Sequence, residues 1–283
     1  MSQEIPQPPH ESPLIPELLN NDASIQFRCH KGVSCYNACC KLADITLTPY
    51  DVLRLKKHFG ISTTDVLAKY TVPFEMDASG MPGIKLKTQD EEPVCLLMNK
   101  EGCSVYENRP SACRYYPVGL MAMRKKDSPV DEHHYCLVKE DHCKGHDEDN
   151  KLTIGQYRKE QGVEEYDEMN REWYQVILKK RSSGPAIGKP STKSFQLFFM
   201  CSYDMDRFRE FVRAEGFQDI FEIDDDEMNR YLSDDYTLLK FAFRFLKQVL
   251  FGEATITVKE GAEERRLAQR VELRAKQKVR TDR

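Results

Sequence analysis

Cysteine is distributed very unevenly along this 283-residue chain, and that distribution restricts its fold more than any other feature. Nine of the ten cysteines lie between Cys29 and Cys143, and only Cys201 lies outside that segment. A lone cysteine such as Cys201 is expected to be a buried thiol, because free cysteine packs as a small apolar side chain. The crowded segment indicates instead that one domain of the chain requires sulfur and the remainder does not.

The N-terminal sequence MSQEIPQPPHESP has neither a basic segment nor an apolar one, which predicts a cytoplasmic protein rather than a secreted one. In a reducing compartment, cysteines are more often metal ligands or catalytic groups than disulfides. Thiolates are soft ligands that select zinc, copper(I) or iron–sulfur clusters, and they exclude magnesium and calcium. The chain is therefore expected to bind a soft metal.

The overall composition excludes two classes of protein. Hydrophobic residues make up 40% of the chain and charged residues 31%, which is the balance of a soluble folded protein. The formal net charge of -4 argues against a nucleic-acid-binding protein held by its overall field. The most apolar segment, residues 236–251, is interrupted by three basic residues, so we expect a core helix there and no membrane span.

The local patterns predict an α+β protein that is mainly helical. A cap at Thr48 predicts a helix that ends near Gly60, and alternation within residues 73–98 predicts short antiparallel strands. Helix is expected from Thr153 onward, apart from a strand in SFQLFFMCSY at 194–203. The expected fold is a small metal-stapled cysteine-rich domain with short antiparallel strands, followed by a helical C-terminal region.

Changes in composition along the chain predict five segments. The first residues are rich in proline, a Ser-, Gly- and Pro-containing stretch follows residue 181, and the last residues are charged throughout. The predicted segments are an N-terminal arm (1–22), a cysteine-cluster metal-binding domain (23–150), a helical connector and linker (151–190), a C-terminal helical subdomain (191–252) and a charged tail (253–283).

The candidate metal ligands fall into three groups along the chain. The spacing of CKGH at 143–146 is typical of a metal site, so His146 joins the cysteines, and the alternative is an exposed histidine in an acidic loop. His142 lies close by, whereas His133 and His134 are weaker candidates. The predicted ligands are Cys29, Cys35, Cys39 and Cys40 in the first group, Cys95, Cys103 and Cys113 in the second, and Cys136, Cys143 and His146 in the third.

Cys39 and Cys40 are adjacent, which is unusual for ligands of one ion. Neighbouring side chains in an extended segment point to opposite sides, so the pair is not expected to hold one small ion together. Two interpretations remain. Either the two thiolates serve different metal ions or different irons of a cluster, or one is a ligand and the other is a buried thiol or a redox partner.

Arg109 and Arg114 flank Cys113 in the segment RPSACR. A nearby guanidinium lowers the pKa of a thiol and donates hydrogen bonds to sulfur, so both arginines are predicted to surround the ligands and tune them. The alternative for each is a surface arginine paired with an acid.

The segment VCLLMNKEGCSVYENRPSACRYYPVG at 94–119 resembles the YkgJ-type cysteine-cluster family, a bacterial family described as a zinc- or iron-chelating domain. The most specific part is CSVYENRPSACRYYP, which is similar to the family block C-x-x-Y-E-x-R-P-x-x-C-R. The resemblance covers residues 24–150. The eight recurrent cysteines that it implies fall on Cys29, Cys35, Cys39, Cys40, Cys95, Cys103, Cys113 and Cys136, with Cys143 as an addition.

The spacing of the first cysteines departs from the usual form of the family, since it is wider here. That departure leaves open whether Cys29 binds the same ion as Cys35 and Cys39. The domain is also similar to the cysteine-rich part of flagellin lysine N-methylases, which are associated with an iron–sulfur cluster.

The leading hypothesis is a metal-binding protein whose cysteines hold an iron–sulfur cluster, with 4Fe–4S favoured, or zinc, for metal chelation or redox chemistry. Zinc sites usually contain paired C-x2-C knuckles, and none occurs here, which favours iron–sulfur. A metal bound by ionised thiols would also contribute to folding.

Two alternatives belong to other functional classes. The resemblance implies an S-adenosylmethionine-dependent protein lysine N-methyltransferase carrying an iron–sulfur cluster, although the sequence contains neither a glycine-rich nucleotide fingerprint nor a C-x3-C-x2-C motif. The other is a metal carrier or redox partner that docks another protein through the acidic run EIDDDE at 222–227, for which a solvated helix start is the simpler explanation.

Overall fold

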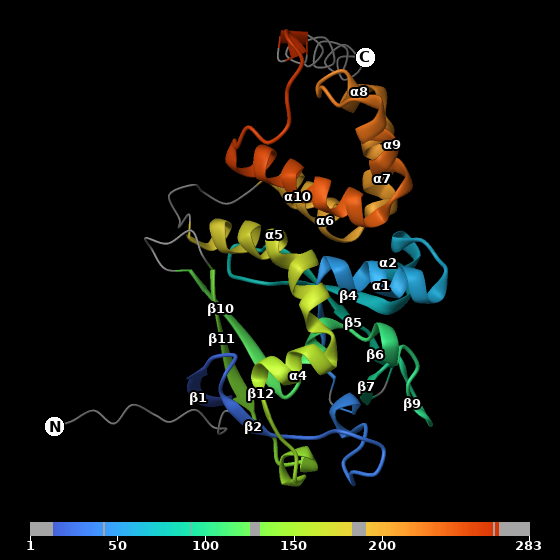
Figure 1. Cartoon of the computed structure of the whole chain (residues 1–283). Coiled ribbons are helices and arrows are strands. Elements are labelled where there is room, and N and C mark those ends of the chain that lie inside the picture. Colours follow the sequence, from blue (N-terminus) through green and yellow to red (C-terminus); the bar gives the residue numbers. More distant parts are fainter. Residues whose placement is uncertain are drawn as a thin grey trace, which may run out of the picture. The chain divides into compact units, whose positions relative to one another are not determined.

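A computed structural model describes residues 14–41, 43–90, 92–124, 131–182, 191–262 and 264–265 (Figure 1). The chain forms two compact units. Unit 1 consists of Met1–Phe59, Tyr70–Phe74 and Gly83–Asn170, and unit 2 consists of Gly60–Lys69, Glu75–Pro82 and Arg171–Arg283. All nine cysteines between Cys29 and Cys143 therefore belong to unit 1, and Cys201 belongs to unit 2.

Short antiparallel strands dominate unit 1, and the longest pair is the hairpin of β10 and β11 (Figure 1). The sheets, each in spatial order, are β1 (Leu14–Leu19), β11 (Asp131–Val138) and β10 (Val118–Arg124); β12 (Lys151–Thr153) and β2 (Ser24–Gln26); β3 (Thr46–Leu47), β5 (Pro82–Leu86) and β4 (Thr71–Glu75); β6 (Thr88–Gln89) and β7 (Glu92–Cys95); and β8 (Met98–Asn99) and β9 (Gly102–Cys103).

The helices and strands of unit 1 share a buried core, which connects the early part of its sequence to the late part. The helical elements are α1 (Pro49–Phe59), α3 (Ser111–Tyr115), α4 (Ile154–Gln161), the first part of α5 (Val163–Ser182), and the 3-10 turns η1 (Ala38–Cys40), η2 (Tyr106–Asn108) and η3 (Lys144–Asp147). Buried side chains from β2, α3, β10, β11, β12 and α4 form one cluster of Ile25, Phe27, Tyr115, Val118, Tyr135, Leu152, Ile154, Tyr157 and Val163. This cluster fixes the start of the cysteine-rich loop, near Phe27, against the segment around residue 150.

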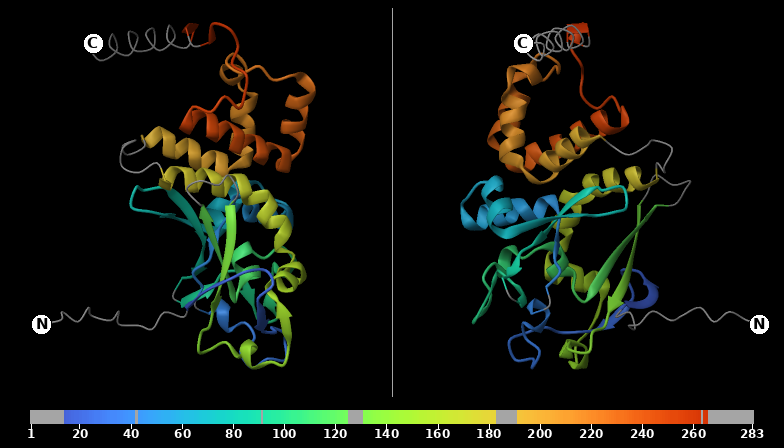
Figure 2. Two further views of the ribbon diagram at one scale, coloured as in Figure 1. Left: turned by 60° about the vertical axis from the view of Figure 1, so that its left-hand side comes forward. Right: turned by 180° about the vertical axis from the view of Figure 1, so that it is seen from behind.

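Unit 2 is helical. Its elements are α2 (Thr63–Tyr70), the remainder of α5, α6 (Thr192–Tyr203), α7 (Met205–Arg213), α8 (Glu215–Gln218), α9 (Asp225–Ser233) and α10 (Asp235–Phe251). Helices α6 and α10 lie side by side (Figure 2). Aromatic rings fill the core, with Phe208 packed 6.1 Å from Phe241 and 5.9 Å from Phe245 between ring centroids. The predicted α+β class, with short antiparallel strands followed by a helical region, is confirmed.

Two local predictions are decided by this fold. The helix predicted between Thr48 and Gly60 is present as α1. The strand predicted at 194–203 is wrong, because that segment forms α6, which begins with a hydrogen bond from Ser194 N to Ser191 Oγ at 3.1 Å. Its buried residues include Phe198 and Cys201, three positions apart on one helical face. Packing against α10 overrides the strand tendency of this apolar run.

Parts of the predicted segments lie outside the described residues. These are residues 1–13 of the arm, 183–190 of the linker, and 263 and 266–283 of the tail. Within the predicted arm, Leu14–Leu19 forms β1 and pairs with β11. No helix among the residues that the structure describes is sufficiently long and apolar to cross a membrane.

The acidic run at 222–227 coincides with the start of α9. The Asp224 side chain accepts a hydrogen bond from Glu227 N at 2.7 Å, and Asp225 and Asp226 lie in the first helical turn. Acidic groups at this position interact favourably with the helix dipole. The structure thus supplies the simpler explanation of the run, and the docking role stays a prediction.

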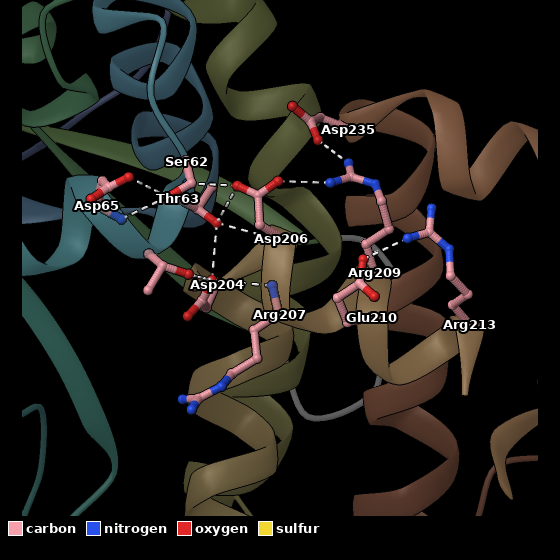
Figure 3. Close-up of polar contacts among 11 residues, drawn as sticks. Ser62, Thr63, Asp65, Asp204, Asp206, Arg207, Arg209, Glu210, Arg213 and Asp235 are labelled. Carbon is pink, nitrogen blue, oxygen red and sulfur yellow. Dashed lines mark hydrogen bonds and ion pairs between the residues drawn. The ribbon is translucent and has the colours of Figure 1, made fainter. Parts of the chain in front are cut away.

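The buried acid Asp204 and the partly buried acid Asp206 join the start of α7 to the start of α2 within unit 2 (Figure 3). Thr63 Oγ1 lies 3.0 Å from Asp204 Oδ1 and 3.0 Å from Asp206 Oδ2, and it accepts a hydrogen bond from Asp206 N at 3.0 Å. Thr63 N donates to Asp206 Oδ2 at 2.6 Å. Arg209 in turn donates to Asp206 Oδ1 at 2.7 Å and forms an ion pair with Asp235. One hydroxyl group therefore lies within hydrogen-bonding distance of two carboxylates, between which its single proton is shared.

We expect the substitution Thr63→Val to lower the free energy of unfolding by about 1–3 kcal/mol, because it removes a buried hydroxyl that lies against both carboxylates and accepts from Asp206 N. Urea unfolding of the full chain measures this loss. The same substitution at Thr192, which is exposed, is the control and should change stability by less than about 0.5 kcal/mol. Equal losses at the two positions would contradict the role given to Thr63.

Candidate metal centre

The cysteines of unit 1 are carried by elements of several kinds. Four lie in the loop between β2 and β3, which includes η1. The others are Cys95 at the end of β7, Cys103 on β9, Cys113 in α3, Cys136 on β11 and Cys143 immediately before η3. None of these thiols forms a disulfide. Their surroundings divide eight of them into two groups.

The first thiol group consists of Cys29, Cys35, Cys39 and Cys143. Two backbone hydrogen bonds, from Phe27 N to Asn150 O at 2.9 Å and from Arg28 N to Gly145 O at 3.0 Å, bring the early loop to the segment that follows Cys143. Desolvation raises the pKa of Cys29 to about 11, and the nearby sulfurs of the same group add to the increase. Each of the other three sulfurs therefore lies within electrostatic range of Cys29.

The second thiol group consists of Cys40, Cys95, Cys103 and Cys113. The β8–β9 hairpin pairs Met98 with Cys103, and Cys95 ends β7 three residues before that hairpin begins. The backbone bond from Ala43 N to Pro93 O, at 2.8 Å, holds the early loop beside β7. Burial raises the pKa of Cys113, and Cys95 and Cys103 raise it further, which places these three sulfurs in one neighbourhood.

Cys39 connects the two groups. A hydrogen bond from the Cys40 thiol lowers the pKa of Cys39 to about 7, and the same bond raises the pKa of Cys40. The Cys39 sulfur also raises the pKa of Cys29 in the first group and, after burial, that of Cys113 in the second. Its thiol is therefore close to both groups.

The expectation that Cys39 and Cys40 lie in an extended segment and point apart is wrong. They end the 3-10 turn η1, which Asn37 begins in the left-handed conformation with φ of 67°. The tight turn, closed by a bond from Cys40 N to Asn37 O at 3.0 Å, brings adjacent side chains within hydrogen-bonding range.

Backbone amides donate to several of the sulfurs. Burial raises the pKa of Cys95 and of Cys103, and the amides of Leu97 and Val105, two residues further along in each case, oppose that increase. The Gly145 amide, two residues after Cys143, likewise opposes the increase that burial causes in the pKa of Cys143. Lys144 N lies 3.1 Å from Cys35 Sγ. An amide pointing at sulfur stabilises the thiolate, the form that binds a metal.

The two arginines have different roles. Arg109 lies over the Tyr106 ring, 4.2 Å from its centroid, and donates to the Gln161 side chain. Its charge opposes the increase that burial causes in the pKa of Cys29 and of Cys103. Among the described residues Arg109 has no acidic partner. It is thus a cation placed beside both thiol groups.

Arg114 donates hydrogen bonds to backbone carbonyl groups. Its guanidinium donates to the carbonyl oxygens of Arg109, Gln161 and Glu107, at 3.1, 2.6 and 2.6 Å. Those three bonds join the end of α4 to the loop before α3. The structure therefore places Arg114 as a support for the Cys113 helix.

Cys136 and His146 have other partners. The Cys136 thiol donates to Gly119 O on β10 at a distance of 3.7 Å. His146 Nε2 lies 3.2 Å from Val138 O, and its ring is 5.2 Å from that of Phe27. The structure does not bring these two residues into either thiol group, and their role as ligands stays a prediction.

Sequence patterns missed one tyrosine that contacts a thiol and another that lies beside the second thiol group. The Tyr116 hydroxyl donates to Glu140 Oε2 at 2.7 Å and also forms a hydrogen bond with Cys143. Tyr36 lies beside Gly102, the residue before Cys103, where an added Cβ would come within 2.9 Å of the Tyr36 hydroxyl oxygen. Nothing in the spacing of these tyrosines marks them, because each reaches its position only through folding.

The arrangement gathers thiols without closing them around an ion. Among the residues that the structure describes, no three Cys, His, Asp or Glu side chains are placed to hold a metal. The donor set nevertheless fits a soft metal: eight sulfurs in two groups, with amide donors and one arginine beside them. A bound cation would offset the mutual repulsion of the thiolates.

The comparison with protein families agrees with this chemistry. Residues 28–144 match the family model described as "CxxCxxCC: Putative zinc- or iron-chelating domain". The resemblance inferred from the sequence is thereby confirmed for this part of the chain. No curated protein and no solved structure matches the chain.

Gly102→Ala should disturb the second thiol group, because φ at this glycine is +123° and the added methyl group would meet the Tyr36 hydroxyl. We expect the purified variant to retain clearly less metal than the wild type, as measured by elemental analysis. Gly60→Ala is the control: it has φ of +62° and nothing within 4 Å, so only a backbone cost of about 1–2 kcal/mol applies. Full metal retention in Gly102→Ala would count against the arrangement described here.

Proposed function

We propose that the two thiol groups bind a metal centre, either an iron–sulfur cluster, with 4Fe–4S favoured, or zinc, and that the chain acts in metal chelation or redox chemistry. The observation that supports this most is the set of backbone amides directed at Cys95, Cys103 and Cys143. Three cysteines from separate elements share one local geometry, in which the amide two residues further along donates to sulfur. Ordinary packing of cysteine does not require such donors.

Iron–sulfur is favoured over zinc on the number and connection of the sulfurs. Cys39 and Cys40 share a hydrogen bond, and Cys39 acts on sulfurs of both groups, whereas the sulfurs beyond Cys39 that act on Cys40 are Cys95 and Cys113 of the second group. That arrangement suits a centre with several metal atoms, because adjacent thiolates then need not share one ion. When bound, the centre would supply electron transfer or Lewis-acid chemistry, and the protein would supply thiolates, amide donors and the Arg109 charge.

Anaerobic purification, elemental analysis and an absorption spectrum test the proposal directly. Iron with inorganic sulfide and a broad band near the blue edge would support the cluster, and zinc in a colourless protein would support the zinc site. We expect Cys39→Ser and Cys113→Ser to lose metal, whereas Cys201→Ala should keep it because Cys201 is buried in unit 2. A folded wild-type chain that binds neither metal would overturn the proposal.

Metal binding should depend on pH in a defined direction. A pKa of about 11 for Cys29 in the metal-free chain means that this thiol carries a proton at pH 7, and a bound thiol must lose it. Affinity should therefore fall as pH falls, and binding at pH 7 should release about one proton for each protonated thiol that becomes a ligand. Proton release in weak buffer during titration with Zn²⁺ measures this number, and a value near zero would contradict thiolate ligation.

The other two functions remain predictions from the sequence. The methyltransferase alternative is tested by calorimetry with S-adenosylmethionine, where no heat at high concentration would remove it. The carrier or redox-partner alternative requires another protein, and pull-down from the native host tests it.

A further inference from the structure

A single buried carboxylate joins the helix that carries Cys113 to the rest of unit 1. Asp51, on α1, is 0% exposed. Its Oδ1 accepts a hydrogen bond from Ser111 N at 2.8 Å. Its Oδ2 accepts from Thr48 N at 2.8 Å and from the Ser111 hydroxyl at 3.1 Å. Both oxygens of the side chain are therefore used, and Ser111 supplies two of the three donors.

Half of this arrangement has a local explanation. Thr48 and Asp51 cap the start of α1 reciprocally, since Asp51 N also donates to Thr48 Oγ1 at 3.3 Å. A cap of this kind is usually near the surface and does not need burial. The bonds to Ser111, 60 positions further along the chain, go beyond capping. A buried charge is costly unless its partners are well placed, so the site must hold Ser111 closely.

The residues around Asp51 at the start of α1 are held by a further buried side chain. Asn170, which is 1% exposed, donates to Thr48 Oγ1 at 3.0 Å and accepts from Tyr50 N at 3.2 Å. Asn170 lies on α5, so three helices meet at one closed hydrogen-bond network. The network leaves Asp51 little freedom to move, and through Ser111 it leaves α3 little freedom either.

Cys113 is two residues after Ser111 in the five-residue helix α3. Burial, the neighbouring sulfurs and then the Asp51 charge all raise the pKa of Cys113, so the carboxylate lies near the sulfur as well as near the backbone. We propose that Asp51 is a positioning residue, which fixes Cys113 as a metal ligand through its bonds to Ser111. This inference rests on the proposed metal-binding function.

Mapped alkylation of the metal-loaded full chain tests the inference. Wild type and Asp51→Asn are treated with iodoacetamide, and mass spectrometry follows the labelling rate of each cysteine. Asparagine keeps only one of the two acceptor oxygens, and its NH2 group would face either the Thr48 amide or the Ser111 amide, both of which are donors, so the hold on Ser111 is weakened. We expect Cys113 to be labelled roughly tenfold faster, with Cys95 and Cys103 affected much less.

Asp204→Asn provides a control for general loss of stability. Asp204 is also a buried carboxylate, 3% exposed, and accepts bonds from Thr63 Oγ1 at 3.0 Å, Thr64 Oγ1 at 2.8 Å and Arg207 N at 3.3 Å, but it lies in unit 2 (Figure 3). This variant should leave the labelling of Cys113 unchanged.

Ser111→Ala is the second variant and decides the matter if Asp51→Asn does not fold. It removes one donor and keeps the amide, so a smaller increase confined to Cys113 is expected. Labelling of Cys113 at the wild-type rate, or an equal increase at all cysteines of the second thiol group, would overturn the inference. A wild-type chain that takes up no metal would instead overturn the proposed function, so the two failures are distinguishable.

Discussion

Sulfur atoms that ionise repel one another, and unit 1 is organised around that constraint. Burial and mutual repulsion raise the pKa of most of the gathered thiols, as at Cys29 and Cys113. The fold opposes this with amides directed at individual sulfurs and with the charge of Arg109. These groups ease the formation of thiolates without completing it, so a cation remains the natural means of balancing the charge.

Most of the supporting groups are backbone atoms, and tight turns direct them. The turn after β7 directs the Leu97 amide at Cys95, the segment after β9 directs the Val105 amide at Cys103, and η3 directs the Gly145 amide at Cys143. The turn η1 brings Cys39 toward Cys40. A side-chain substitution does not remove a backbone amide donor. A single substitution can, however, distort the turn that directs the amide toward sulfur. Gly102 is such a position, because its φ and its closeness to Tyr36 leave no room for a side chain.

Sequence patterns predicted features that depend on neighbouring residues. The Thr48 cap defined the start of α1, and the block around Cys103 and Cys113 carried the resemblance to the cysteine-cluster family, whose model matches residues 28–144. They failed where distant packing decides: residues 194–203 form a helix because α10 lies beside them. The adjacent pair Cys39 and Cys40 was placed in an extended segment because a left-handed Asn37 has no reliable sequence signal. The second role of Asp51 depends on a serine 60 positions away, which no local pattern contains.

The two units are interlaced along the chain, and this limits how the protein can be divided. Residues Gly60–Lys69 belong to unit 2 although they lie between two parts of unit 1. A fragment ending near residue 150 would keep Thr63 but remove Asp204 and Asp206, and would leave α2 without the carboxylates that its first residue contacts. Any attempt to express the cysteine-bearing part by itself must therefore redesign that surface or retain the C-terminal helices.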